Sequence, residues 1–91
     1  MNMNELAKRL ELETVCPSAN EADVETGYAS DLLSDVMGNA AHGSALITIQ
    51  AHKNTLAVAS LKDMPGIIVC NNRQVPDDMA ESARAEGIGI F

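Results

Sequence analysis

Residues 50–54 read Gln-Ala-His-Lys-Asn and join an apolar strand-like run to a helix-like segment. His52 could serve as an acid, a base, a ligand or a hydrogen-bond donor to a bound molecule. It could equally cap a helix or contact a second subunit. Asn54 is a residue type that favours helix N-caps, and it could cap and face a ligand at once. The stretch is therefore either the edge of a site or a solvated connection.

A second set of polar residues, at positions 30–35, precedes residues 50–54 in the chain. Asp31 and Asp35 are four residues apart, so on one helix they would share a face and could hold Mg²⁺ or exchange protons. A solvated helix face is the alternative. Ser30 and Ser34, together with His52, contain a nucleophile and a base. No strained nucleophile elbow and no third member accompany them, so we do not expect a hydrolytic triad.

The composition narrows the class of protein. The chain has 91 residues, 46% of them apolar, which predicts one domain over residues 1–91. A net charge of −7 and nearly absent aromatic residues argue against nucleic acid as a partner. No secretory signal and no membrane-length apolar run is present, so we expect a cytoplasmic protein. Cys16 and Cys70 lie far apart in no metal-binding spacing, and both are expected to be buried.

Metal and cofactor motifs are also missing. The chain has no zinc-type pattern of His and Cys, no GxxxxGK[ST] and no GxGxxG. We therefore expect no metal and no cofactor, although a nucleotide could still bind through helix N-termini.

Strand-like runs begin near residues 24, 45, 66 and 88, and each interval holds one helix-like segment. Such intervals are long enough for parallel crossovers. A short helix capped by Asn2 with Glu5, and a possible strand over residues 12–16, come first. We expect Ser30 to cap the helix over residues 31–37, Gly38 to end it, and Gly87 to end the last helix. The pattern predicts an α/β fold: a small, mainly parallel sheet of four or five strands with flanking helices, built from repeated strand–helix units.

That architecture brings the polar residues to one edge. Ligands of open α/β sheets bind beyond the carboxyl ends of the strands, where residues 30–31, 50–54 and 71–73 should meet. Three helix N-termini should point there with free N–H groups. The bases Lys53 and Arg73 fall in these loops, so the edge could be locally positive and could bind a small anionic metabolite or nucleotide.

The runs GYASDLLSDVMGNA and ALITIQAHKNTLAVASLKDMPGIIVCNN, followed by an acidic helix, resemble the DRTGG-domain family from Val24 to Phe91. The name-giving motif is degraded: residues 23–28 read DVETGY, without the basic residue and the second glycine. The resemblance implies an α/β domain similar to the N-terminal domain of HPr kinase/phosphorylase. The family occurs alone or attached to phosphotransacetylases or CBS-domain pairs, which implies sensing or regulation. Stand-alone members are encoded near iron hydrogenase and redox-regulatory genes of anaerobes.

We therefore expect a regulatory or accessory domain rather than an enzyme, acting as a homodimer and independent of membranes. The residues expected to bind its ligand are the polar positions shared with the family, together with the two loop bases: Ser30, Asp31, Ser34, Asp35, Thr48, Gln50, His52, Lys53, Asn54 and Arg73. The alternative is an interaction protein without a small-molecule ligand, in which these loops and residues 57–61 contact a redox enzyme or its maturation machinery.

Overall fold

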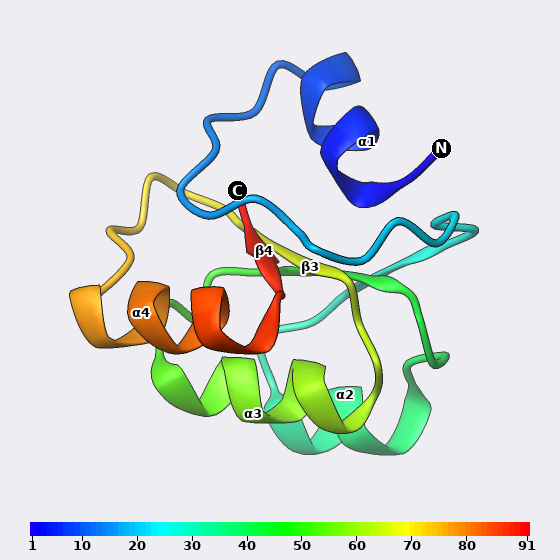
Figure 1. Cartoon of the computed structure of the whole chain (residues 1–91). Helices are drawn as coiled ribbons and strands as arrows, with labels where there is room; N and C mark the ends of the chain where they lie inside the picture. The colour runs from blue at the N-terminus through cyan, green and yellow to red at the C-terminus, as the bar shows by residue number, and fades with distance from the viewer.

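The computed structural model describes all 91 residues, which form one parallel sheet and four helices (Figure 1). The elements in chain order are α1 (Met3–Arg9), β1 (Gly27–Ala29), α2 (Leu33–Asn39), β2 (Ala45–Thr48), α3 (Lys53–Leu61), β3 (Gly66–Val69), α4 (Asp77–Glu86) and β4 (Gly89–Ile90). The α/β class, the parallel sheet and the repeated strand–helix units are confirmed, with four strands rather than five.

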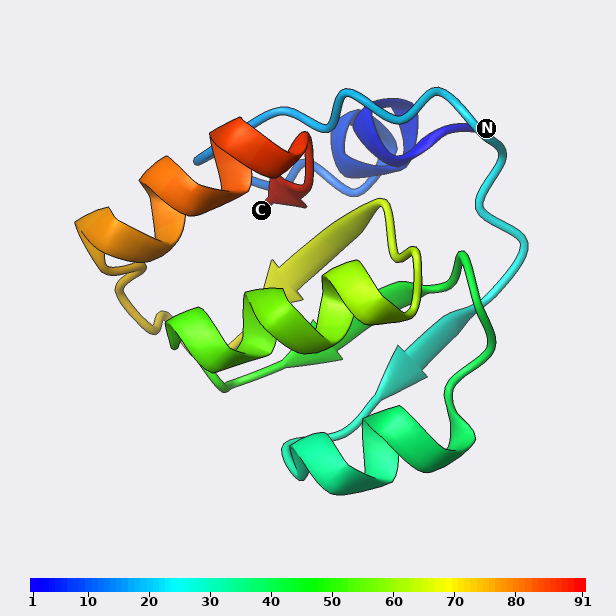
Figure 2. The ribbon, with the colours of Figure 1, turned by 60° about the horizontal axis from the view of Figure 1, so that its bottom comes forward.

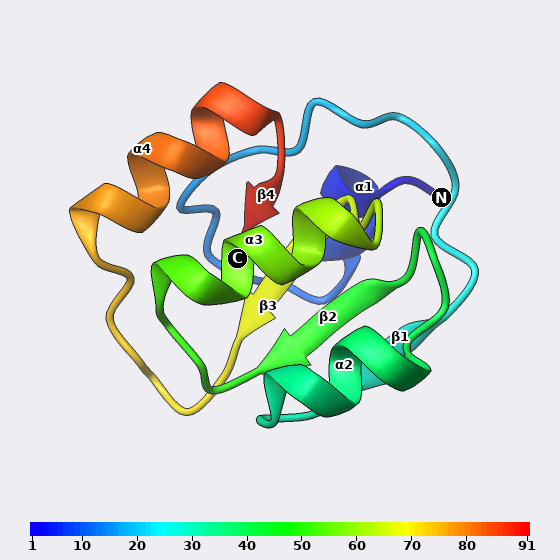
Figure 3. The same cartoon turned by 90° about the horizontal axis from the view of Figure 1, so that it is seen from below.

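The strands lie side by side in the order β1-β2-β3-β4, and every neighbouring pair is parallel (Figure 2). Parallel crossovers are almost always right-handed. When consecutive strands are also neighbours, that rule places every crossover helix on the same face. Figures 1 and 3 show this arrangement: α2, α3 and α4 cover one face, and α1 lies alone on the other.

Two apolar clusters hold these layers together. Along β2, Ala45 packs with the α1 side, whereas Leu46 belongs to the cluster beneath α2, α3 and α4. Ile67 and Ile68 divide in the same way on β3. Each fully buried aliphatic side chain contributes roughly 1.5–3 kcal/mol relative to exposure. Burial on both faces explains why the run over residues 67–70 is continuously apolar.

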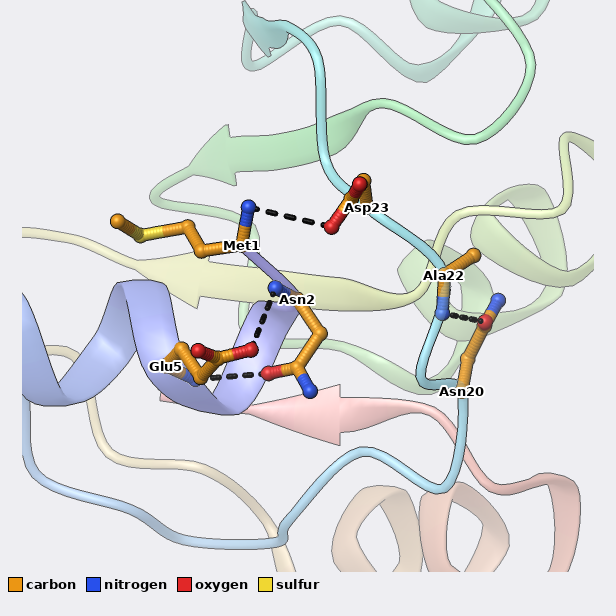
Figure 4. A network of polar contacts seen from close by, with 6 residues as sticks. All are labelled: Met1, Asn2, Glu5, Asn20, Ala22 and Asp23. Atoms are coloured by element: carbon orange, nitrogen blue, oxygen red, sulfur yellow. Dashed lines mark hydrogen bonds and ion pairs between the residues drawn. The ribbon is translucent and has the colours of Figure 1, made fainter.

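Polar contacts join the N-terminal segment to the chain that leads into β1 (Figure 4). The Asn2 side chain accepts the Glu5 N–H at 2.9 Å, and the Glu5 carboxylate accepts the Asn2 N–H at 3.1 Å. The predicted capping box is therefore confirmed. The Met1 ammonium lies 3.2 Å from the Asp23 carboxylate, and the Met1 carbonyl accepts the Val24 N–H. These contacts hold α1 beside the segment that leads into β1.

Residues 12–16 do not form a strand. Cys16 makes only an isolated antiparallel bridge to Ile90, because Pro17 follows at once and has no N–H to continue the pairing. The first strand is also shorter than predicted. Pairing with β2 begins where the Thr26 carbonyl accepts the Ala45 N–H, whereas Val24 is already bonded to Met1.

Both ends of α2 differ from the prediction, whereas the C-terminal end of α4 agrees with it. Helix α2 starts at Leu33 without a side-chain cap, and it continues through Gly38 to Asn39. The Ser30 hydroxyl accepts the Leu32 N–H in a local turn and so does not cap α2. Helix α4 follows Pro76 and ends at Gly87, whose φ of 73° is the left-handed conformation expected of a C-terminal glycine.

Close packing of α1 on β3 depends on Gly66. A Cβ at Gly66 would overlap Met3 Cγ and would lie 2.9 Å from Met3 Sδ, and the Met3 side chain is fully buried. We predict that Gly66→Ala lowers the free energy of unfolding by about 1–3 kcal/mol. In a Met3→Ala background the same change should cost at least about 1 kcal/mol less, because its steric partner is gone. Urea unfolding of the four proteins measures this coupling.

Gly38→Ala is the matched control for this cycle. Gly38 lies within α2, and nothing lies within 4 Å of a Cβ added there. The change should therefore stabilise the protein by about 0.5–1 kcal/mol. Additive costs for Met3→Ala and Gly66→Ala would show that α1 does not pack on β3 through this contact.

Candidate functional site

The carboxyl edge of the sheet has no central crevice. In doubly wound sheets the crevice forms where the strand order reverses, but here the order runs from β1 to β4 without a reversal. The loops after the strands instead border separate depressions. The predicted site residues are consequently divided among different places on the surface.

Three predicted residues come together after β1 and β2. Asp31 Oδ1 accepts hydrogen bonds from Thr48 Oγ1 at 3.2 Å and from the Ile49 N–H at 2.9 Å. Gln50 Nε2 donates to the Asp31 carbonyl at 3.0 Å. Ser30, Asp31 and Thr48 also line a depression of about 240 Å³ with Ala29, Ile47, Ile49 and Cys70. These polar groups therefore join the ends of β1 and β2, and they form hydrogen bonds largely with each other.

His52 caps α3, and the expectation that Asn54 is the N-cap is wrong. His52 Nδ1 accepts the Asn54 N–H at 3.0 Å, so the ring takes the capping role two residues earlier. Nδ1 is therefore used as a hydrogen-bond acceptor within the protein. Asn54 itself is exposed. The cap also consumes one of the N–H groups that an anion would need at this helix.

Asp35 belongs to a different network. Its carboxylate accepts hydrogen bonds from the Tyr28 hydroxyl and the Asn39 amide, each at 2.8 Å. The Ser30 and Tyr28 hydroxyls and the Asn39 amide lower the pKa of Asp35 below its ordinary value near 3.8. The bond to Asp35, together with burial, raises the pKa of Tyr28 above 10.

Asp31 precedes α2, so the expected pair of carboxylates on one helix face is not formed. Ser34 is exposed on α2. No three His, Cys, Asp or Glu side chains lie close enough together to hold a metal ion. Burial raises the pKa of the Cys16 thiol, and the charge of Arg84 opposes this shift only in part.

The two loop bases lie in separate depressions. Lys53 borders one of about 290 Å³ between α3 and α4, with residues that include Leu56, Ser82 and Glu86. Arg73 borders the largest depression, of about 580 Å³, at the carboxyl ends of β3 and β4. Its lining residues are Glu11, Leu12, Glu13, Val15, Val69, Asn72, Arg73, Gln74, Val75 and Phe91.

A tight turn presents Arg73 to this depression. Asn71 and Asn72 both have positive φ, at 63° and 54°, and the Arg73 N–H reaches back to the Cys70 carbonyl. Two successive left-handed residues make a turn of type I′, for which Asn is well suited. The Asn-Asn pair was a sequence signal for this turn. The contribution of residues 11–15 had no such signal, because it depends on how the chain returns after α1.

Arg73 is the one basic residue that lines this depression, and it forms no ion pair. The two ion pairs of the chain join Met1 to Asp23 and His42 to Asp63, so no carboxylate lies within 4 Å of Arg73. Glu11 and Glu13 line the same depression, but their carboxylates lie more than 4 Å from the Arg73 guanidinium, beyond the distance of an ion pair. The lining thus combines one unpaired arginine, two amide residues, two acidic residues and several apolar residues.

Comparison with known proteins gives no match to a family model, a curated protein or a solved structure. The resemblance to the DRTGG-domain family stays a prediction. None of the four helices combines the length and the apolar character that crossing a membrane would require.

The Tyr28–Asp35 bond gives a measurable pH dependence. Because the Asp35 pKa is lower in the folded than in the unfolded chain, its ionised form stabilises the fold above about pH 4. That stability is lost as the pH falls through the folded pKa. We predict that Tyr28→Phe raises the Asp35 pKa toward its ordinary value and that Asp35→Asn lowers the Tyr28 pKa toward 10. NMR titration of the carboxyl carbon and ultraviolet titration of the phenol measure the two shifts. An unchanged Asp35 pKa in Tyr28→Phe would contradict the bond.

Proposed function

We propose that this protein is a non-catalytic regulatory or accessory domain of the DRTGG type that binds a small anionic ligand at the carboxyl-end edge of its sheet. The observation that carries the proposal is the unpaired Arg73 on the largest depression. The ligand class is a nucleotide or a phosphorylated or carboxylated metabolite. The link to hydrogenase or redox metabolism rests on the family resemblance alone.

Size and chemistry support this site. A volume of about 580 Å³ falls within the roughly 300–1,000 Å³ of small-molecule sites. A guanidinium binds phosphate and carboxylate oxygens through paired N–H donors. The neighbouring amides of Asn72 and Gln74 supply directional hydrogen bonds, and Val69, Val75 and Phe91 supply an apolar floor.

The geometry favours binding over catalysis. His52, the candidate base, uses Nδ1 to cap α3, and Ser30 uses its hydroxyl in a local turn. Neither residue lines the Arg73 depression. A hydrolytic mechanism would need a base and a nucleophile within hydrogen-bond reach of each other, and no such contact is formed by His52.

Removing Arg73 tests the site. Thermal-shift screening would use nucleotides, acyl phosphates and related anions. We predict that an anion that raises the Tm of the wild type does not raise the Tm of Arg73→Ala. A ligand at 100 times its Kd adds about 2.7 kcal/mol to the stability of the wild type. For a domain of this size that is a shift of order 10 °C or more in Tm.

Lys53→Ala is the matched control, because it removes the same charge from a different depression. It should keep the full ligand shift. Equal loss in both variants would show attraction to net charge only, and a full shift in Arg73→Ala would place the site elsewhere. Light scattering on the same samples tests the expected homodimer, which would have twice the chain mass of 9.6 kDa.

Glu13 gives a test of opposite sign. Glu13 lines the depression and is in no ion pair, so its negative charge repels an anion bound at Arg73. We predict that Glu13→Gln tightens binding of the screened anion by roughly two- to fivefold at low salt, and that the gain shrinks as salt is added. Isothermal titration at two ionic strengths measures it. Weaker binding in Glu13→Gln would mean that the ligand carries a cationic group facing Glu13.

A further inference from the structure

Strand β1 leaves one edge of the sheet open. It has β2 as its only neighbour, and it is the outermost strand in Figure 2. The Thr26 carbonyl and the Ser30 N–H are bonded to β2. Since backbone groups alternate in direction along a strand, Gly27 and Ala29 point their N–H and C=O groups away from the sheet. Only a long contact of 3.5 Å, from the Thr26 hydroxyl, reaches the Gly27 carbonyl.

The sheet surface beside this edge is also bare. Helix α1 packs on Ala45, Ile68 and Phe91, and neither β1 nor Ile47 belongs to that cluster. Ala29 is exposed, and Ile47 and Ile49 are only half-buried. These side chains line the shallow depression after β1 and β2. An apolar strip therefore adjoins a row of free backbone donors and acceptors, as in edges that accept an added strand.

Acidic side chains predominate around this edge, and the Met1 ammonium that pairs with Asp23 is the positive charge beside them. Residues 10–52 contain seven acidic residues and no Lys or Arg, so they carry the whole formal charge of −7. The other six acids and six bases cancel. Asp23 and Glu25 precede β1, and Asp31 follows it. Asp35 of α2 accepts a hydrogen bond from Tyr28 of β1. The open edge thus lies beside Glu25, Asp31 and Asp35, whereas Glu11 and Glu13 lie at the Arg73 depression near β3 and β4.

We propose that β1 is a docking edge for an extended basic segment of another protein. The segment adds a strand beside Gly27 and Ala29 through main-chain hydrogen bonds. Its apolar side chains alternate onto the strip formed by Ala29, Ile47 and Ile49. Its Lys or Arg side chains face Glu25 before the strand, and Asp31, bonded to Thr48 and Ile49, adds negative charge at the other end. This surface is separate from the Arg73 depression, so either proposal can fail without the other.

Charge decides against a second copy of the chain as the occupant. A two-fold pairing of β1 with itself would set the acidic residues before one strand beside Asp31 after the other. Like charges juxtaposed at an interface cost binding energy and slow encounter. A basic segment gains from the same field, because attraction by several carboxylates speeds encounter at low salt.

The test uses a short fluorescein-labelled peptide of alternating Val and Lys, with a Val and Glu version as the charge control. Fluorescence anisotropy at low salt should show binding of the Lys peptide only, with affinity falling as salt is added. Hydrogen exchange followed by NMR should show slower exchange of the Gly27 and Ala29 amides in the complex. Protection confined to other strands or helices would overturn the proposal.

Two variants separate edge pairing from general attraction. Ala29→Pro removes an N–H that no bond in the sheet uses, and proline is tolerated at such edge positions. It should weaken peptide binding about tenfold, the cost of one main-chain hydrogen bond. Glu25→Lys should weaken binding several-fold, whereas Glu81→Lys, the same charge change on α4, should leave it nearly unchanged.

Three further results would overturn the proposal. Equal weakening by Glu25→Lys and Glu81→Lys would show that only net charge matters. Peptide binding to a folded Ala29→Pro at wild-type affinity would exclude pairing through the edge. A wild-type dimer that Ala29→Pro converts to a monomer would show that a second copy occupies β1. If Ala29→Pro does not fold, the Glu25→Lys and Glu81→Lys variants and the exchange measurement still decide whether the peptide binds at β1.

Discussion

The parallel sheet with consecutive strand order is the constraint on which the rest of the molecule depends. Right-handed crossovers between neighbouring strands place α2, α3 and α4 on one face. On the other face, the cover comes from the chain that precedes β1. A seven-residue helix and the segment after it cover the β3 and β4 side but not β1. The tight fit of Met3 over Gly66 shows how closely that cover is seated.

The same strand order shapes the carboxyl edge. Without a reversal there is no shared crevice, and the polar residues after the strands mostly bond to the protein itself. Asp31 joins β1 to β2 through Thr48 and Ile49, and His52 caps α3. Arg73 is different, because a left-handed Asn-Asn turn carries it into the largest depression without an acidic partner. A free cation on an acidic protein is where an anion gains most.

The part of the sheet that α1 leaves bare lies beside acidic residues, whereas Glu11 and Glu13 lie at the Arg73 depression. Residues 10–52 hold the whole net charge, and they include the edge strand and the part of the sheet that α1 leaves bare. The bases lie in α1 and in the later strand–helix units. The molecule therefore presents two chemically distinct surfaces, an acidic strand edge at β1 and a depression with a free guanidinium at β3 and β4.

The sequence by itself determined the α/β class, the strand starts near 45 and 66, the capping box at Asn2 and the helix end at Gly87. Those features follow from local periodicity and from residue types that satisfy backbone groups nearby. The tertiary structure alone decided the strand order, and with it which loops share a depression. It separated Lys53 from Arg73, brought Glu11 and Glu13 beside Arg73, and gave the α3 cap to His52 rather than Asn54. These outcomes depend on contacts between residues distant in sequence, whose energies no local pattern records.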